Sequence, residues 1–561
     1  MKSEFFQKLV EKAVQELFGV TVEAQVDRTK DLSHGDYATS VALVLAKQLG
    51  KGALEIATEL AAYLDKHKES FVASVAVAGP GFINFTISRA HQVDGIREAA
   101  HVDTYGHTNV YTGKNILIEH SSPNLFKPFH IGHLMNNTIG EAITRLAKYS
   151  GAQVTTVSFP SDISLGVAKA IFIIIRDHLT EDHIFNPKDI VILGEAYTKG
   201  VKLYDEDESI HGRVKEIADN LYAGIDSVEL KIFNVCKQFN IDYFEHTVAK
   251  LGSHFDAYIY ESEAGVDGKK IVLDNTPKIF TQSEGAIVYM PEDPKLHTAV
   301  FINSQGNPTY EAKDIGLLDL KFKGYAPDQS IFITDAQQVS HFQIVLDAGA
   351  KINPAWKEKS LHRYHGRMSF KGQKMSSRLG GVPIVEDILN TVIEEVKTKN
   401  ADVSDTAAQQ IGIAAIKFAI LRAAAGKNID FDPDTSLSFE GDSGPYLQYT
   451  AVRAGSLLEK GKQAGIAPDV QVGPVQGTET IEKLVARFPE IMTEAQREWA
   501  PHTIVGYLLD LAQSFNSWYG QGKIIDEDKE ATAYRLAVVK AVRQTLVNGL
   551  HVLGIEVPTK M

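Results

Sequence analysis

The residues best suited to chemistry lie in one short stretch, Ser121–His133, whose sequence is SSPNLFKPFHIGH. The pattern predicts that a strand ends just before this stretch and that a helix begins near its end. Ligands bind at this edge of open α/β sheets, and the free N–H groups and positive dipole end of a helix start favour phosphate. His130 and His133, three residues apart, can both face a triphosphate there. Gly132 permits a close approach of a nucleotide to the backbone, and Lys127 can add a positive charge.

A bare His-x-Gly-His is also compatible with an ordinary strand–helix turn. The string that precedes and contains it here, SSPNLFKPFHIGHL, resembles the signature of class I aminoacyl-tRNA synthetases, in the version carried by the arginyl-tRNA synthetase family. The resemblance implies that ATP and L-arginine are substrates. It also implies that His130 and His133 stabilise the ATP phosphates while the amino acid carboxylate attacks the α-phosphate. Such a reaction needs alignment and charge stabilisation more than covalent participation by the protein.

A second match to the family lies far downstream, at Lys374-Met375-Ser376-Ser377-Arg378. Alone, Lys-Met-Ser is more typical of a solvated surface loop, but its position after the first motif and three further strand patterns supports the match. The resemblance implies that Lys374 contacts the pyrophosphate as charge develops, with neighbouring glycines allowing the loop to close. We expect His130, His133, Lys374 and Lys127 to be catalytic. We expect ATP to be bound by Gly132, His130, His133, His341, Lys374, Met375 and Ser376.

A third segment, SQGNPTYEAKD, resembles the family's substrate pocket, with a lysine where arginine is usual. Tyr310 and Asp314 are four residues apart, so on a helix they share one face. Taken alone, such a pair is more often an ordinary helix-surface pair; its weight comes from the agreement of four segments in order. By resemblance Asp314 binds the guanidinium and Tyr310 packs nearby. Gln338, Glu119 and Asn124 complete the residues expected to bind arginine.

Aromatic and polar residues near both ends of the chain resemble the tRNA-contacting parts of the same family. GDSGPYLQYTAVR resembles the start of the anticodon-binding helical domain, and AQSFNSWY gathers three aromatic side chains. Such side chains stack on splayed bases or meet phosphates, although Phe515 and Trp518 have helical core spacing. GPGFINF in the first hundred residues resembles the module that touches the tRNA elbow. The expected tRNA-binding residues are Phe82, Asn84, Tyr446, Gln448, Arg453, Asn516, Tyr519 and Met561.

The elements that must position these residues form an α/β, multidomain chain. We expect an N-terminal α/β module over 1–105, followed by a polar linker over 101–114. A Rossmann-like parallel-sheet catalytic domain is expected over 115–383, with a mainly helical insertion at about 165–285. A helical stem and an all-helical anticodon-binding domain are expected over 384–561.

Within the catalytic domain the pattern predicts a strand at 115–121, a helix closing at about Ser150, and a strand at 153–159. This is the repeating unit of a parallel sheet. Strand patterns return at 286–291, 297–303 and 329–334.

Composition limits the remaining possibilities. The chain has 561 residues, 44% of them hydrophobic, and one cysteine, which excludes an intrachain disulfide. No apolar run reaches the length of a membrane helix, and the acidic N-terminal segment lacks the features of a secretion signal, so a cytoplasmic protein is expected. The net charge of −14 excludes indiscriminate coating of nucleic acid. RNA must therefore meet local patches.

The function expected is arginine–tRNA ligase, with tRNA(Arg), L-arginine and ATP as partners. Mg²⁺ is expected with ATP, held mainly by phosphates and water, and no dedicated metal ligands are found in the sequence. A monomer is expected. Two alternatives stay open at this point. One is a catalytically silent paralogue that binds RNA, and the other is a different nucleotidyltransferase that uses the same His-x-Gly-His loop.

Overall fold

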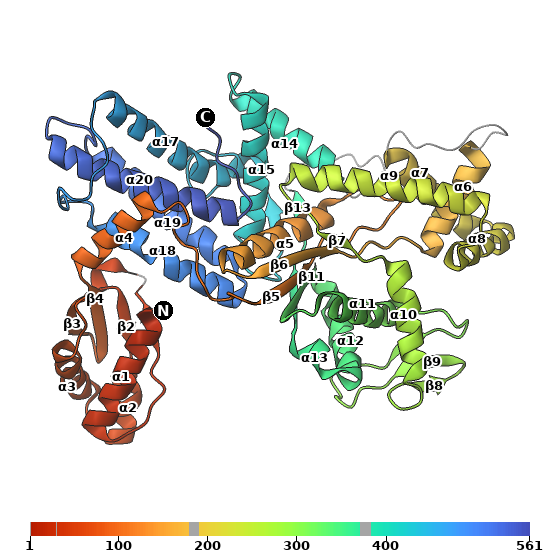
Figure 1. Ribbon diagram of the computed structural model, residues 1–561, viewed down its shortest axis with the longest axis horizontal. Helices are drawn as coiled ribbons and strands as arrows, with labels where there is room; N and C mark the ends of the chain where they lie inside the picture. The colour runs from red at the N-terminus through yellow and green to blue at the C-terminus, as the bar shows by residue number, and fades with distance from the viewer. Residues whose placement is uncertain (1, 30, 179–189, 371–382) are drawn as a thin grey trace.

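The computed structural model describes residues 2–29, 31–178, 190–370 and 383–561. The N-terminal module lies at one end of the molecule, the parallel sheet lies in the middle, and long C-terminal helices cover one side of that sheet (Figure 1). No described helix is long and apolar enough to cross a bilayer.

The N-terminal module is a four-stranded antiparallel sheet of order β1-β2-β4-β3 packed against helices. Its core is built around Phe6, Tyr37 and Phe85, which are all buried. Gly79-Pro80-Gly81 forms the hairpin turn between β3 and β4, which pair antiparallel. The elements are α1 (Lys2–Phe18), β1 (Val26–Arg28), η1 (Leu32–His34), β2 (Tyr37–Thr39), α2 (Val41–Leu49), α3 (Ala53–Lys66), β3 (Val72–Ala78) and β4 (Phe82–Ile87).

The central sheet is five-stranded and parallel throughout, with strand order β12-β11-β5-β6-β7. The chain builds outward from β5 to one edge and then returns to add β11 and β12 on the other side. This reversal places the switch point of the sheet between β5 and β11, where open α/β sheets form a crevice beyond the strand ends. The elements are β5 (Asn115–Glu119), α5 (Ile131–Tyr149), β6 (Gln153–Ser158), β7 (Ala257–Tyr258), β11 (Gln329–Asp335), η3 (Ala336–Gln338), α12 (Val339–Ile352), α13 (Pro354–Glu358) and β12 (Ser360–His365).

Helices form most of the insertion between β6 and β7, as the sequence predicts. They are α6 (Leu165–His178), α7 (Ile190–Glu206), η2 (Glu208–Ile210), α8 (His211–Ala223) and α9 (Val228–Lys250). The strand patterns at 286–291 and 297–303 do form strands, but these belong to a separate three-stranded antiparallel sheet, β10-β9-β8. This sheet lies beside a helix pair in the lower right of Figure 1. Its elements and the pair are α10 (Glu261–Asp274), β8 (Thr281–Ser283), β9 (Ala286–Tyr289), β10 (Ala299–Ile302) and α11 (Tyr310–Tyr325).

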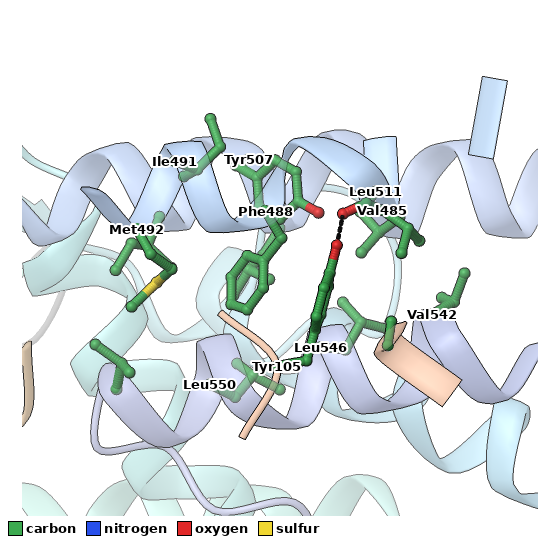
Figure 2. Packing of buried hydrophobic residues seen from close by; sticks show 14 of the residues in the cluster. Tyr105, Val485, Phe488, Ile491, Met492, Tyr507, Leu511, Val542, Leu546 and Leu550 are labelled. Carbon is green, nitrogen blue, oxygen red and sulfur yellow. Dashed lines mark hydrogen bonds between the residues drawn. The ribbon is translucent and has the colours of Figure 1, made fainter. Parts of the chain in front are cut away.

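From residue 383 onward, the regular elements are helices apart from β14 (Ile429–Phe431), which pairs parallel with β13 (Met368–Phe370). One hydrophobic core joins most of these helices to α5 and the central sheet. Figure 2 shows Phe488 of that core with Tyr507 above it, Met492 to one side, and Leu546 and Leu550 below. The helices are α14 (Val385–Lys399), α15 (Asp405–Leu421), α16 (Pro433–Ser436), α17 (Gly444–Gln463), α18 (Glu479–Glu498), α19 (Pro501–Gln521) and α20 (Lys529–Val552).

The segment predicted as a polar linker, 101–114, is irregular but packed. A helix that the sequence reading did not identify, α4 (Arg89–His101), leads into it. Tyr105 is buried, and its hydroxyl donates to the carbonyl of Val485 at 2.8 Å, as Figure 2 shows. The ring of Tyr111 stacks on Trp499. The aromatic residues among the polar ones therefore fasten this segment to the C-terminal helices.

Candidate active site

A cavity of about 560 Å³ lies at the switch point of the central sheet. The N-terminus of α5 forms one part of its wall, and the first turns of α10 and α11 form another. All of the predicted ATP- and arginine-binding residues that the structure describes line it. Its wall includes Glu119, Asn124, His130, Gly132, His133, Glu261, Tyr310, Lys313, Asp314, Gln338, His341 and His365.

Two strained backbone positions shape the loop from β5 to α5. Ser121 and Phe126 have φ of 56° and 64°, in the left-handed region that non-glycine residues rarely adopt. Side-chain amides hold both: Asn136 Oδ1 accepts from the N–H of Ser121 at 2.6 Å, and Asn240 Oδ1 accepts from the N–H of Phe126 at 2.6 Å. Strain that persists only through such contacts is typical of ligand-binding loops.

The two histidines of the loop form a stacked pair at the start of α5, with ring centroids 3.8 Å apart. The Nδ1 atom of His130 accepts from the N–H of Gly132 at 3.1 Å, and the Nδ1 atom of His133 accepts from the N–H of His130 at 3.2 Å. In a neutral imidazole one nitrogen accepts and the other carries the hydrogen. Each ring therefore carries its hydrogen on Nε2, which can act as a donor.

Burial, reinforced by the nearby charge of Lys127, lowers the pKa of His130 and holds the pKa of His133 well below its usual value. Both rings are neutral at pH 7. They can thus serve a phosphate as fixed hydrogen-bond donors rather than as cations.

Lys127 does not line the cavity. Its ammonium group lies 4.2 Å from the centre of the Tyr197 ring, on the inserted helix α7. A cation over an aromatic face gains modest stabilisation, so this position competes with a contact to phosphate. The second predicted loop, with Lys374, Met375, Ser376 and Arg378, lies outside the described residues.

Acidic side chains gather in the part of the cavity formed by α11. Asp314 is buried, and its Oδ2 atom lies 2.6 Å from Nε2 of His341. Burial raises the pKa of Asp314, against the opposing effect of this hydrogen bond. Burial alone would lower the pKa of His341, but Asp314 and Glu311 raise it to about 9. His341, predicted to border the nucleotide, therefore pairs with the carboxylate predicted to bind arginine.

Two buried ion pairs complete this acidic part of the wall. Glu119, at the end of β5, accepts from Lys321 Nζ at 2.7 Å. Glu261 and Lys313 form a close ion pair. Burial alone would lower the pKa of Lys313, but Glu261 together with Tyr222 and Tyr310 raises it. Glu261 was not predicted, because residues 165–285 were expected to form one mainly helical insertion. In the structure the short strand β7 returns to the parallel sheet within that range, and Glu261 follows it at the start of α10.

The other predicted arginine-binding residues lie toward the opening of the cavity. Tyr310 is 68% exposed at the first turn of α11, so it packs little in this structure. Gln338 and Asn124 are exposed, and Asn124 bridges to Ser161. Asn136 and His365, which were not predicted, also line the cavity. Asn136 donates to the carbonyl of Ile333 and so ties α5 to β11.

Four of the predicted tRNA-binding residues meet on one surface between α17 and α19. The guanidinium of Arg453 lies between the rings of Tyr449 and Tyr519, at 4.7 and 5.0 Å from their centres. It also donates to Asn516, which in turn donates to the hydroxyl of Tyr446 at 3.0 Å. The result is an aromatic and cationic surface that opens into a hollow of about 410 Å³.

The prediction that Gln448 contacts tRNA is wrong. It is fully buried, and its amide donates to the backbone carbonyls of Gln410 and Glu556 at 3.2 and 2.6 Å. Residues three and seven apart share a helix face, whereas residues two apart do not. Tyr446, Tyr449 and Arg453 therefore face outward together, while Gln448 points into the bundle.

The remaining predicted tRNA contacts lie elsewhere. Met561 is half-buried and packs against the core that contains Phe129 and Val385. Phe82 is 40% exposed at the start of β4, and Asn84 is half-buried on the same strand. Nothing in the structure assigns these three a ligand.

Comparison with known families identifies three matching segments. Residues 4–87 match the arginyl tRNA synthetase N-terminal domain, and residues 98–432 match the catalytic domain of class I (R) tRNA synthetases. Residues 447–561 match the DALR anticodon binding domain. The catalytic match alone covers more than half of the chain.

Curated relatives and solved structures agree with these matches. An arginine--tRNA ligase from Alkaliphilus metalliredigens is 29% identical, with all of both chains covered. One from Bacteroides thetaiotaomicron is 28% identical, covering 100% of this chain and 98% of the other. The arginyl-tRNA synthetase of Thermus thermophilus superposes with a TM-score of 0.81 at 27% identity over 100% of both chains. That of Plasmodium falciparum, at 19% identity, covers 100% of this chain and 99% of the other with a TM-score of 0.83 and supports the fold.

Proposed function

This chain belongs to the arginyl-tRNA synthetase family of class I enzymes, and from that premise we propose roles for its residues. The activity of the family is the ATP-dependent joining of arginine to tRNA(Arg), with release of AMP and diphosphate. One observation carries the assignment of the site. The cavity has fixed N–H donors at the start of α5 and buried carboxylates on α10 and α11, so it suits a triphosphate beside a cation. A silent paralogue and an unrelated nucleotidyltransferase are not favoured.

The α5 N-terminus binds the ATP phosphates in this proposal. The Nε2–H groups of His130 and His133 donate to phosphate oxygens, and Gly132 adds a backbone N–H at the positive end of the helix. Because both rings are held in place before ATP arrives, they stabilise the charge that develops on the leaving pyrophosphate without reorganising. Lys374 and Lys127 are proposed to add positive charge, and Lys127 would have to leave Tyr197 to do so.

The α10–α11 wall binds arginine. Asp314 accepts the guanidinium. Glu119 offers a further hydrogen-bond acceptor and Glu261 lines the same wall, although each already has a lysine partner. Asn124, Gln338 and Tyr310, near the opening, contact the polar end of the amino acid and close over it. Arginine held there presents its carboxylate to the α-phosphate, which reduces the reaction to a matter of alignment. The adenylate formed is then attacked by the 3′ end of the tRNA.

The surface around Arg453 is proposed to receive the anticodon loop. Tyr446, Tyr519 and Asn516 offer a stacking face and hydrogen-bond groups around one guanidinium, a combination suited to unpaired bases. Phe82 and Asn84 of the N-terminal module, and Met561, are proposed as further contacts. The division into 1–105, 115–383 and 384–561 remains a proposal too.

We also propose that ATP brings Mg²⁺ with it. No group of three or more potential metal-binding side chains occurs among the described residues, so the ion would be held mainly by phosphates and water. We propose a monomer as well, as expected from the sequence. A role in translation favours the cytoplasm. Light scattering on the purified protein tests the monomer.

Pyrophosphate exchange into ATP tests the arginine pocket, with tRNA(Arg) present because activation in this family usually needs it. We compare L-arginine with L-citrulline, which has the same shape but no charge, and with L-lysine. A buried carboxylate left without its cation costs several kcal/mol, so exchange should occur with arginine and be at least about 100-fold weaker with citrulline. Equal exchange with citrulline would show that Asp314 does not bind the guanidinium.

A further inference from the structure

His341 lies between two carboxylates of α11. Its Nε2 atom is 2.6 Å from Asp314 Oδ2, and its Nδ1 atom is 3.6 Å from Glu311 Oε1. A neutral imidazole carries a hydrogen on only one nitrogen. An acceptor at each nitrogen therefore stabilises the doubly protonated form. Asp314 and Glu311 raise the pKa of His341 to about 9, although burial opposes them.

The charges around this trio leave one negative charge in excess. Lys313 is paired with Glu261, Lys321 with Glu119, and Arg367 lies 4.0 Å from Asp335, so these three pairs contribute no net charge. Burial lowers the pKa of His362, on the neighbouring strand β12, to about 4, so that ring is neutral. Asp314, Glu311 and the cationic His341 sum to one negative charge. One guanidinium would balance it.

We propose that protonated His341 is a stand-in for the guanidinium. Its imidazolium pairs with Asp314 while no arginine is bound. When arginine binds, the guanidinium takes its place on Asp314, and His341 keeps its proton and pairs with Glu311. This inference rests on the proposed role of Asp314. The geometry makes the transfer short, because a shift of less than about 1 Å brings the 3.6 Å contact to the length of a charged hydrogen bond. Glu311 is then a positioning residue, which receives the displaced cation and touches no substrate.

Glu311 is suited to this task by its place in the first turn of α11, where the positive end of a helix favours a carboxylate. Burial would raise the pKa of Glu311, but hydrogen bonds from His341, its own backbone and Thr309 hold it below its usual value. The carboxylate is thus charged before arginine arrives.

The movement of His341 determines how many protons are released when arginine binds. With Glu311 present, arginine binds without proton release, because two cations then face two carboxylates. In Glu311→Gln only Asp314 remains, so the imidazole must lose a proton to solvent as the guanidinium enters. Arginine should also bind about tenfold more weakly, the equivalent of losing one partly buried charged contact.

Isothermal titration calorimetry of the full chain with L-arginine, in the presence of tRNA(Arg), measures the number of protons released per arginine bound. The pH is set to about 7.5, because this lies between the ordinary pKa of histidine and the raised one. The dependence of the heat on the ionisation enthalpy of the buffer gives the protons released. We expect near zero for the parent protein and close to one for E311Q. E311D, which keeps a carboxylate, should release none. Glu292→Gln removes one charge from an exposed ion pair with Lys351 and should behave like the parent.

Proton release from the parent protein, or E311Q with no release and unchanged affinity, would overturn the inference. Asp314→Asn separates this failure from failure of the proposed function. If D314N binds arginine as tightly as the parent, Asp314 is not the guanidinium partner. If D314N loses arginine while E311Q behaves like the parent, the pocket stands and the stand-in role of His341 falls.

Discussion

Two glycines allow α10 and α11 to touch backbone to backbone, and replacing one of them should displace the arginine pocket. A Cβ added at Gly316 would lie 1.9 Å from the carbonyl oxygen of Ala264, and one at Gly268 would lie 1.8 Å from that of Ala312. Real Cβ atoms essentially never come within 3.0 Å of another atom. Gly316→Ala must therefore separate the helices by more than about 1 Å, and Asp314 lies one half-turn away.

The size of the effect follows from two opposing contributions. Overpacking costs about 1–3 kcal/mol, and replacing a helical glycine by alanine returns up to about 1 kcal/mol. We expect G316A to melt a few degrees lower. A displacement of about 1 Å at a site of alignment can cost about 100-fold in rate, so kcat/KM for arginine should fall by about that factor.

Gly324→Ala is the matched control, because it lies on the same helix and has no atom within 4 Å of the added Cβ. Thermal melting and pyrophosphate exchange with tRNA(Arg) measure both quantities in the two variants. If G316A melts and exchanges like G324A, the close helix contact does not position Asp314, and the reasoning fails.

Three other changes probe separate parts of the molecule. His133→Ala should lower kcat by about 100-fold or more with little change in arginine affinity, because its contact strengthens only as phosphate charge develops; unchanged turnover in a single-turnover assay would exclude it from the site. Arg453→Ala should raise the KM for tRNA(Arg) while exchange at saturating tRNA stays near normal; an unchanged KM would exclude this surface from binding. Lys417 is fully buried, and burial lowers its pKa from 10.5 to about 8. Between pH 8 and 10.5 the unfolded chain therefore holds this proton more tightly than the folded chain, so the free energy of unfolding should rise with pH over that range. The rise should be up to about 3 kcal/mol, and urea unfolding of Lys417→Met should lack it; parallel curves for the two proteins would contradict the shift.

The sequence predicted the parts of the fold that local pattern determines. The strand at β5, the loop and the helix α5 form a contiguous unit with clear periodicity, and the structure places His130 and His133 at the start of that helix. The strand patterns at 286–291 and 297–303 were also predicted, but not that they form a separate antiparallel sheet, because periodicity identifies a strand without showing to which sheet it belongs.

The same limit applies to the candidate site: residues within a motif could be predicted, whereas contacts between separate elements could not. Asp314 was found through its motif, but its partner His341 could not be assigned, because the pairing joins α11 to α12 across the cavity. Glu261 was missed because a two-residue strand leaves almost no periodic signal. Gln448 was misassigned because it sits among aromatic residues in the sequence, whereas the helical period turns it inward.

The central claim is that the cavity at the switch point holds phosphate at α5 and guanidinium at Asp314. A crystal structure with a non-hydrolysable arginyl-adenylate analogue tests it most directly. We predict the phosphate group within hydrogen-bond distance of His130 or His133 and the guanidinium on Asp314, with His341 turned to Glu311. A guanidinium placed elsewhere, with the Asp314–His341 contact intact, would contradict it.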